Sequence, residues 1–69
     1  MTFTFLNITM GNYLISVEQE KFENIFSVKV YKIYESGNGR EIFKKYYKTY
    51  RGSVKKAYDL AQAAENNKL

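Results

Sequence analysis

The chain has 69 residues, no Cys, no His and a formal net charge of +4. A chain of this length folds as one domain with a small core, so we expect residues 1–69 to form a single unit without a deep pocket. The absence of Cys excludes disulfides and thiolate metal sites, and the absence of His removes the usual metal ligand and general base. We therefore expect a protein that is not an enzyme, with no catalytic or metal-binding residues and no cofactor.

The chain also lacks signals for membranes and export. No segment approaches the roughly 20 apolar residues of a membrane span, and the N-terminus has neither the basic start nor the apolar core of a signal peptide. We expect a cytoplasmic protein without a membrane partner. Tyr, Lys, Asn, Ile and Phe are abundant while Pro and Trp are absent, a bias typical of AT-rich genomes such as many phages and mobile elements carry.

The first half of the chain predicts β-strands. Residues 3–8 are β-prone and form either a strand or an arm, and residues 10–12 predict a turn. Residues 13–18 alternate between apolar and polar side chains, whereas residues 19–24 are polar and predict a loop. Residues 25–34 are rich in β-branched and aromatic side chains, which makes them the best strand candidate in the chain.

A hairpin should follow this strand. Ser36-Gly37-Asn38-Gly39 supplies residues that tolerate positive φ, as a tight connection requires. The return strand is predicted from about Glu41 to Tyr50, with Phe43 and Tyr47 facing the core because that choice buries fewer charges. Its other face then carries Ile42, Lys44, Tyr46, Lys48 and Tyr50.

The last part of the chain predicts a helix. Ser53 is a suitable N-cap after Gly52, and Leu60 falls on the edge of an apolar stripe at helical spacing. That stripe consists of Val54, Ala57, Tyr58, Ala61 and Ala64. The predicted fold class is α+β: an antiparallel sheet of three strands, or four if residues 3–8 pair with it, with one C-terminal helix packed on one face.

Positive charge is concentrated in the middle of the sequence. Residues 29–56 contain nine of the eleven basic side chains and two acidic ones, Glu35 and Glu41, so this segment carries +7. The first 28 residues sum to −2 and the last 13 to −1. Such a polarised chain attracts phosphate backbones or acidic protein surfaces; a well-solvated face is the alternative interpretation.

The predicted solvent face of the hairpin interleaves Tyr and Lys. Lys29 and Tyr31 lie on one strand, opposite Lys44, Tyr46, Lys48 and Tyr50 on the next. Lys neutralises phosphate, and a Tyr ring stacks on a base with about 1–3 kcal/mol. Alternatively, these cross-strand pairs only cover an exposed sheet. Arg40 at the hairpin tip and the Arg51, Lys55 and Lys56 group at the helix start are further candidates, with a solvated turn as their alternative. The predicted partner-binding or nucleic-acid-binding residues are Lys29, Tyr31, Arg40, Lys44, Tyr46, Lys48, Tyr50, Arg51 and Lys55.

Parts of the chain resemble a known family. The stretch Phe-Ser-Val-Lys-Val-Tyr at 26–31, a Gly-containing turn, Tyr-Lys-Thr at 47–49 and Ala-Tyr-Asp-Leu-Ala at 57–61 resemble the AP2-like and integrase arm-type DNA-binding domains. Those domains share a three-stranded sheet, an aromatic-x-Thr entry and an Ala-rich helix. The family places its sheet face in the DNA major groove, and the resemblance implies that Lys29, Tyr31, Lys44, Tyr46 and Lys48 would lie at DNA.

In size and composition the chain is also similar to small accessory proteins of phages and mobile elements, including anti-CRISPR proteins. Such proteins act by covering a surface of a larger host complex. Our first hypothesis is therefore a non-catalytic protein that inhibits or modulates a host nucleoprotein complex by protein contact, and our second is DNA or RNA binding through the sheet face. A homodimer through the Phe3 and Phe5 segment or an exposed strand edge could accompany either.

Overall fold

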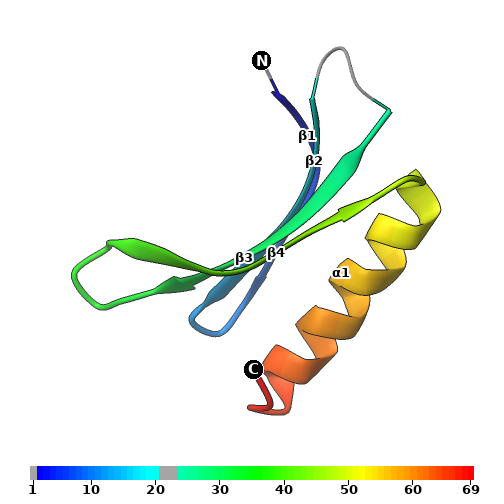
Figure 1. The fold of residues 1–69 in the computed structure, drawn as a ribbon. Coiled ribbons are helices and arrows are strands. Elements are labelled where there is room, and N and C mark those ends of the chain that lie inside the picture. Colours follow the sequence, from blue (N-terminus) through cyan, green and yellow to red (C-terminus); the bar gives the residue numbers. More distant parts are fainter. Residues whose placement is uncertain (1, 21–23) are drawn as a thin grey trace.

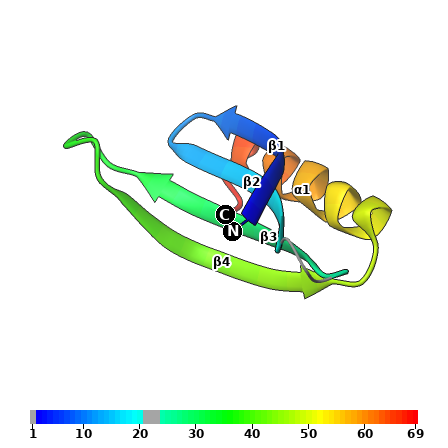
Figure 2. The same ribbon diagram turned by 90° about the horizontal axis from the view of Figure 1, so that it is seen from above.

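Figure 1 shows a computed structural model of the protein, which describes residues 2–20 and 24–69. Four strands precede one helix, and their bounds are β1 Thr2–Met10, β2 Tyr13–Glu20, β3 Phe26–Ile33, β4 Gly39–Tyr47 and α1 Tyr50–Glu65. The strands form one antiparallel sheet in the order β1-β2-β3-β4, with β1 and β4 at its edges (Figure 2). The α+β fold class is confirmed, and the segment predicted as a strand or an arm is a strand.

The core lies between α1 and one face of the sheet, which the helix crosses after the chain reverses at the end of β4 (Figure 1). Strands β2 and β3 contribute β-branched side chains that alternate with polar ones, and the helix contributes small side chains that let it approach the sheet closely. The fully or almost fully buried apolar residues are Ile15, Val17, Val28, Val30, Ala57, Leu60, Ala61 and Ala64. Phe43 and Tyr47 pack against this cluster, so the predicted core face of β4 is confirmed.

Both tight turns use glycine in the left-handed region. Gly11 has φ 60° in the β1–β2 turn, and Gly37 has φ 87° in the β3–β4 turn, which few other residues adopt without strain. The backbone N–H of Tyr34 donates to the carbonyl of Asn38 at 2.9 Å and closes the second turn. The predicted hairpin is confirmed.

The end of β4 differs from the prediction. The strand ends at Tyr47, so Tyr50 is the first helical residue and not the last strand residue. The N-cap is Thr49, which has an extended backbone and whose side-chain oxygen accepts a hydrogen bond from the N–H of Gly52 at 3.1 Å. Ser53, predicted as the cap, lies inside the helix, and its hydroxyl donates to the carbonyl of Tyr50 at 2.6 Å. Thr49 precedes Ser53 and also has a hydroxyl that can cap a helix, so the helix begins earlier than predicted.

The buried stripe of α1 is also rotated from the predicted one. Tyr58 is exposed and Leu60 is buried, because a phenol ring at the helix–sheet contact would force the two layers apart, whereas Leu60 and the alanines fit. The predicted loop at 19–24 is shorter than expected, since β2 continues to Glu20. Residues 21–23 of that loop lie outside the described residues.

Each edge strand contains a β-bulge. On β1, Thr4 pairs with Glu18 and Leu6 with Val17, which leaves Phe5 as the extra residue. On β4, Val30 pairs with Phe43 while Tyr31 pairs with Glu41, which leaves Ile42 unpaired. A bulge shifts the alternation of faces by one residue, so Ile42 does not continue the row of Lys44 and Tyr46, and Glu41 takes its place beside Tyr31.

Candidate functional site

The face of the sheet away from α1 is not covered by another element of the described chain, and we call it the open face. Residues directly opposite in an antiparallel pair share a face. Lys29 is opposite Lys44 and Ser27 is opposite Tyr46, while Tyr31 is opposite Glu41. The sheet therefore brings four of the predicted site residues together on the open face: Lys29, Tyr31, Lys44 and Tyr46.

Lys29 is already paired within the chain. Its ammonium lies 2.9 Å from the Glu18 carboxylate, and the two side chains are only 20% and 17% exposed. The hydrogen bond to Glu18 raises the pKa of Lys29, with partial burial opposing it and the Glu18 charge adding to it. The pair is close to neutral as a unit, so Lys29 contributes little net charge to the open face.

Lys44 stands in a different environment. It forms no ion pair with any described residue, and its ammonium lies 5.1 Å from the centre of the Tyr46 ring. The polar interaction with the neighbouring Tyr46 side chain raises the pKa of Lys44. Tyr46 is 59% exposed, so this Lys–Tyr pair presents a cation and an aromatic ring to solvent together.

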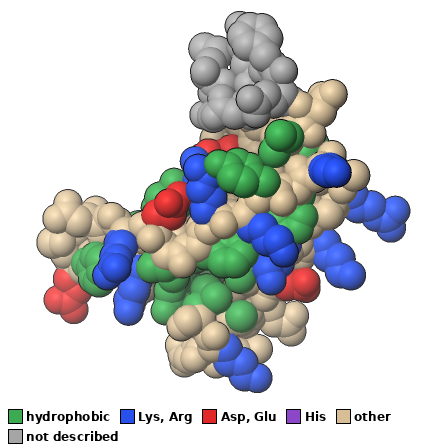
Figure 3. Space-filling model, viewed as in Figure 1, with side chains coloured by type: hydrophobic (Ala, Val, Ile, Leu, Met, Phe, Trp, Pro, Cys, Tyr) green, Lys and Arg blue, Asp and Glu red, His purple; other side chains and the backbone are tan. Residues whose placement is uncertain are grey.

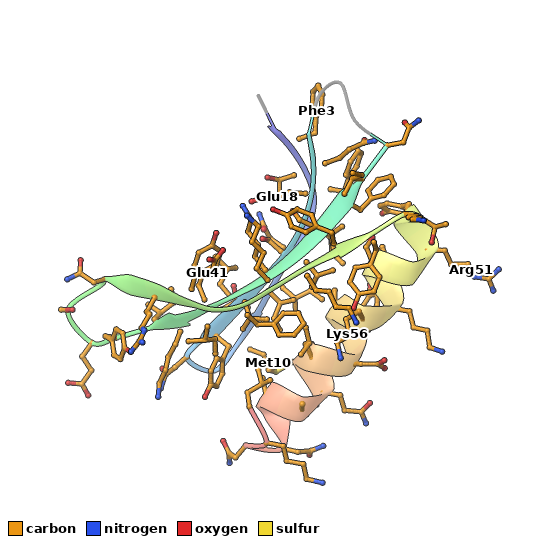
Figure 4. All side chains as sticks on the ribbon, viewed as in Figure 1. Phe3, Met10, Glu18, Glu41, Arg51 and Lys56 are labelled. Carbon is orange, nitrogen blue, oxygen red and sulfur yellow. The ribbon has the colours of Figure 1, made fainter. Side chains whose placement is uncertain are left out.

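The open face is less basic than the sequence pattern suggests. Glu18 and Glu41 both lie on the side of the sheet away from α1 (Figure 4). Ser16, at the centre of this face, is only 3% exposed, and its buried hydroxyl has no hydrogen-bond partner among the described residues. The middle of the open face therefore combines a neutralised ion pair with a buried polar atom.

Most of the positive charge that forms no ion pair follows β4 and the start of α1, and the other such side chains among the described residues are Lys32 on β3 and Lys68 after the helix. Lys44 and Lys45 are neighbours on the edge strand and point to opposite faces, and Lys56 of the helix lies 5.7 Å from the centre of the Phe43 ring. We call these side chains the basic rim: Arg40, Lys44, Lys45, Lys48, Arg51, Lys55 and Lys56. None of them forms an ion pair with another described residue. Figure 3 shows Lys and Arg side chains spread along β4 and around the helix start.

One member of the rim, Lys45, was not named as a candidate from the sequence, whereas Lys56 was named in the group at the helix start but not among the predicted binding residues. Lys45 lies on the strand face that also carries Phe43 and Tyr47, and its ammonium is 5.5 Å from the centre of the Tyr47 ring. A Lys on the core side of a strand remains solvated only when that strand is at the edge of the sheet. The consecutive lysines Lys44 and Lys45 could have indicated this position in the sequence. Only the order of the strands in the sheet shows that they lie on an edge strand.

Tyr50 does not lie on the open face beside Tyr46, but belongs to the first turn of α1. Its ring lies 5.5 Å from that of Phe5 and 5.7 Å from that of Phe26, and the two Phe rings are 6.1 Å apart. We call Phe5, Phe26 and Tyr50 the aromatic cluster; Phe5 and Tyr50 remain 46% and 47% exposed. The bulge on β1 aims Phe5 at this cluster, and sequence reasoning missed it because both the bulge and the helix start depend on tertiary structure.

Other kinds of site are not formed by the described part of the chain. Across residues 2–20 and 24–69, no three potential metal ligands of the His, Cys, Asp or Glu type gather together. The helix, at 16 residues, is neither long nor apolar enough to cross a membrane. An open hollow of about 300 Å³ lies where the β1–β2 turn meets the end of β3, lined by Thr9, Gly11, Asn12, Lys32, Ile33, Tyr34 and Glu35.

Comparison with protein-family models, curated proteins and solved structures finds no match. The functional interpretation therefore rests on the basic rim, the Lys44–Tyr46 pair and the aromatic cluster.

Proposed function

We propose that this protein is a non-catalytic binding protein that holds nucleic acid along its basic rim. The observation that carries the proposal is the contrast between Lys29, which is paired with Glu18, and the seven rim side chains, which have no ion pair with a described residue. Like charges gathered on one side of a small domain repel one another. A polyanion relieves that repulsion and gains entropy by releasing its counterions.

The contact fits the phosphate backbone better than the base edges. The rim follows an edge strand and the first turns of a helix, and its cations lie on both sides of that strand, so they can track successive phosphates. Tyr46 can stack on an unpaired base or pack against sugar beside Lys44. Glu18 and Glu41 discourage the insertion of the whole open face into a groove. We therefore expect binding with little sequence preference.

The first test is fluorescence anisotropy with labelled duplex and single-stranded DNA and RNA at low and at physiological salt. The proposal requires binding that weakens as salt rises, with a slope of log K against log salt of about −0.9 for each phosphate neutralised on duplex DNA. A pool of unrelated sequences is the control for specificity. Absence of binding at low salt, or an affinity that salt does not change, would refute the proposal.

The aromatic cluster favours a second candidate, a phage or mobile-element protein of the cytoplasm that inhibits a host nucleoprotein complex by protein contact, as anti-CRISPR proteins do. Half-exposed aromatic side chains are strong anchors in protein interfaces because they bring a large contact area at low entropic cost. Phe5 and Tyr50 are such side chains, and Arg51, which follows Tyr50 in the chain, extends into solvent (Figure 4).

This second candidate predicts a different set of sensitive residues. A nuclease-treated host lysate should yield a protein partner that the Tyr50→Ala variant fails to retain and that moderate salt does not release. The Tyr58→Ala variant is the matched control, since Tyr58 is exposed on the same helix and outside the cluster. Equal retention by both variants would exclude the aromatic cluster as the contact.

A further inference from the structure

The two edges of the sheet are built differently. β4 carries Arg40, Glu41, Lys44 and Lys45, whereas β1, with the sequence TFTFLNITM, has no charged residue over its nine positions. An edge strand presents unpaired backbone N–H and C=O groups, and charged side chains, Lys above all, are a common protection against pairing with another chain. β4 has this protection and β1 lacks it.

The part of β1 that is available for pairing is well defined. The bulge at Phe5 interrupts the strand near its start, while the register with β2 is regular from Leu6 to Met10. Within this stretch, Leu6, Ile8 and Met10 face the side of α1 and alternate with the exposed Asn7 and Thr9. Figure 2 shows β1 as the outermost strand on its side of the sheet.

The core is open at this edge. Leu6 and Ile8 pack against the buried cluster but are only half-buried, as is Met10, which lies on the helix side of the sheet (Figure 4). A further strand beside β1 would remove more of this apolar surface from water and would pair the free backbone groups at the same time. The neighbouring strand must bring apolar side chains to the same face.

We propose that the β1 edge pairs with β1 of a second copy of this chain, antiparallel about a two-fold axis at Ile8, to form an eight-stranded sheet. This register places Leu6 opposite Met10 and Asn7 opposite Thr9, and it is the self-pairing that uses all five regular residues. This pairing extends the row of apolar side chains on the helix side of the sheet. On the open face it places the small polar side chains of the two copies opposite each other.

Charge favours a second copy at β1 over one at β4. The strand itself is uncharged, so pairing two copies brings no like charges together across the seam. The two basic rims would lie at the outer edges of the joined sheet, seven strand spacings apart, or about 34 Å if the sheet were flat. That separation exceeds the screening length of about 10 Å at 0.1 M salt, so the rims would hardly repel each other.

The inference stands without the proposed function, and it can fail separately. If both hold, the dimer offers two rims roughly one turn of duplex DNA apart, because one turn is about 34 Å. If only the dimer holds, the mass in solution doubles without any effect of nucleic acid.

The experiment is sedimentation equilibrium from micromolar to near-millimolar protein. The parent should approach twice the chain mass of 8.1 kDa and should do so equally at low and high salt. The variant Asn7→Lys/Thr9→Lys adds two charges at exposed positions of the seam and should remain a monomer. The control Ser36→Lys/Gln62→Lys adds the same charge at exposed positions outside β1 and should dimerise like the parent.

A second measurement guards against a variant that fails to fold. Because the chain has no Cys, Ile8→Cys should form an interchain disulfide under mild oxidation, since directly opposed residues have the Cα separation that a disulfide needs. Ser36→Cys should not cross-link. A parent that stays monomeric at all concentrations, a dimer that survives the two lysines on β1, or an Ile8→Cys variant that does not cross-link would overturn the proposal. A dimer abolished only by changes in β4 would assign the interface to the other edge.

Discussion

Two lysines that lie directly opposite each other on the open face should respond differently to the same substitution. Lys29 and Lys44 form a cross-strand pair, and replacing either by Gln removes one positive charge. They differ in their partners, because Lys29 is held 2.9 Å from Glu18, whereas Lys44 has no ion pair with a described residue. If the rim holds phosphates, only Lys44 has a charge free for one.

The size of the difference follows from counterion release. Loss of one phosphate contact reduces the magnitude of the slope of log K against log salt by about 0.9 on duplex DNA. When the salt concentration is lowered four-fold, the binding constant of the variant should therefore rise about 3.5-fold less than that of the parent. Lys44→Gln should show this change and leave the free energy of unfolding nearly unaltered. Lys29→Gln should leave the slope unchanged and lower the free energy of unfolding by about 1 kcal/mol, because Glu18 loses its partner.

Anisotropy titrations over a series of salt concentrations give the slopes, and urea denaturation followed by circular dichroism gives the free energies of unfolding. Tyr46→Phe is a useful third variant because it keeps the aromatic ring beside Lys44 and removes the hydroxyl, the polar group through which Tyr46 raises the pKa of Lys44. Equal slopes for the two Gln variants, or a larger change for Lys29→Gln, would contradict both the assignment of Lys44 to the contact and the neutral role given to the ion pair.

Three further predictions concern stability. Ser16→Ala should not destabilise the protein and should gain up to about 1 kcal/mol, because the buried hydroxyl has no partner among the described residues; a clear loss in urea denaturation would show that this hydroxyl is paired. Thr49→Ala should lose about 1 kcal/mol by removing the acceptor for Gly52 N–H, and an unchanged midpoint would assign the cap elsewhere. The raised pKa of Lys29 predicts that its ion pair with Glu18 stabilises the fold fully below the ordinary Lys pKa of about 10.4 and is lost as pH rises through the higher folded-state value. The stability gap between the parent and Lys29→Gln should therefore close at high pH, and a gap that persists there would point to packing.

Local patterns were sufficient for the elements that depend on near neighbours. The alternation of β-branched and polar residues in 25–34, the two glycines of the hairpin and the alanine-rich last third of the chain predicted a strand, a turn and a helix that the structure contains. The choice of Phe43 and Tyr47 for the core also held, because burying the other face would have buried more charge. Each of these decisions is made within a few residues of the chain.

The arrangement of the candidate site was decided by tertiary contacts. The Tyr and Lys residues predicted to share one face belong in the structure to three separate groups: the Lys29–Glu18 ion pair, the basic rim and the aromatic cluster. Which group each residue belongs to depends on two β-bulges and on which strands lie at the edges of the sheet. Lys29 meets Glu18 because β2 and β3 pair in one particular register. Tyr50 meets Phe5 because a helix begins where a strand was expected.

The sequence by itself determined the type and order of the elements and the excess of positive charge in residues 29–56, since both follow from the identity of neighbouring residues. Only the tertiary structure decided which of those charges form ion pairs and that the uncharged strand β1 lies at an edge of the sheet. Strand register and edge position join residues far apart in the chain, and one extra residue in a bulge exchanges the faces of the side chains that follow it.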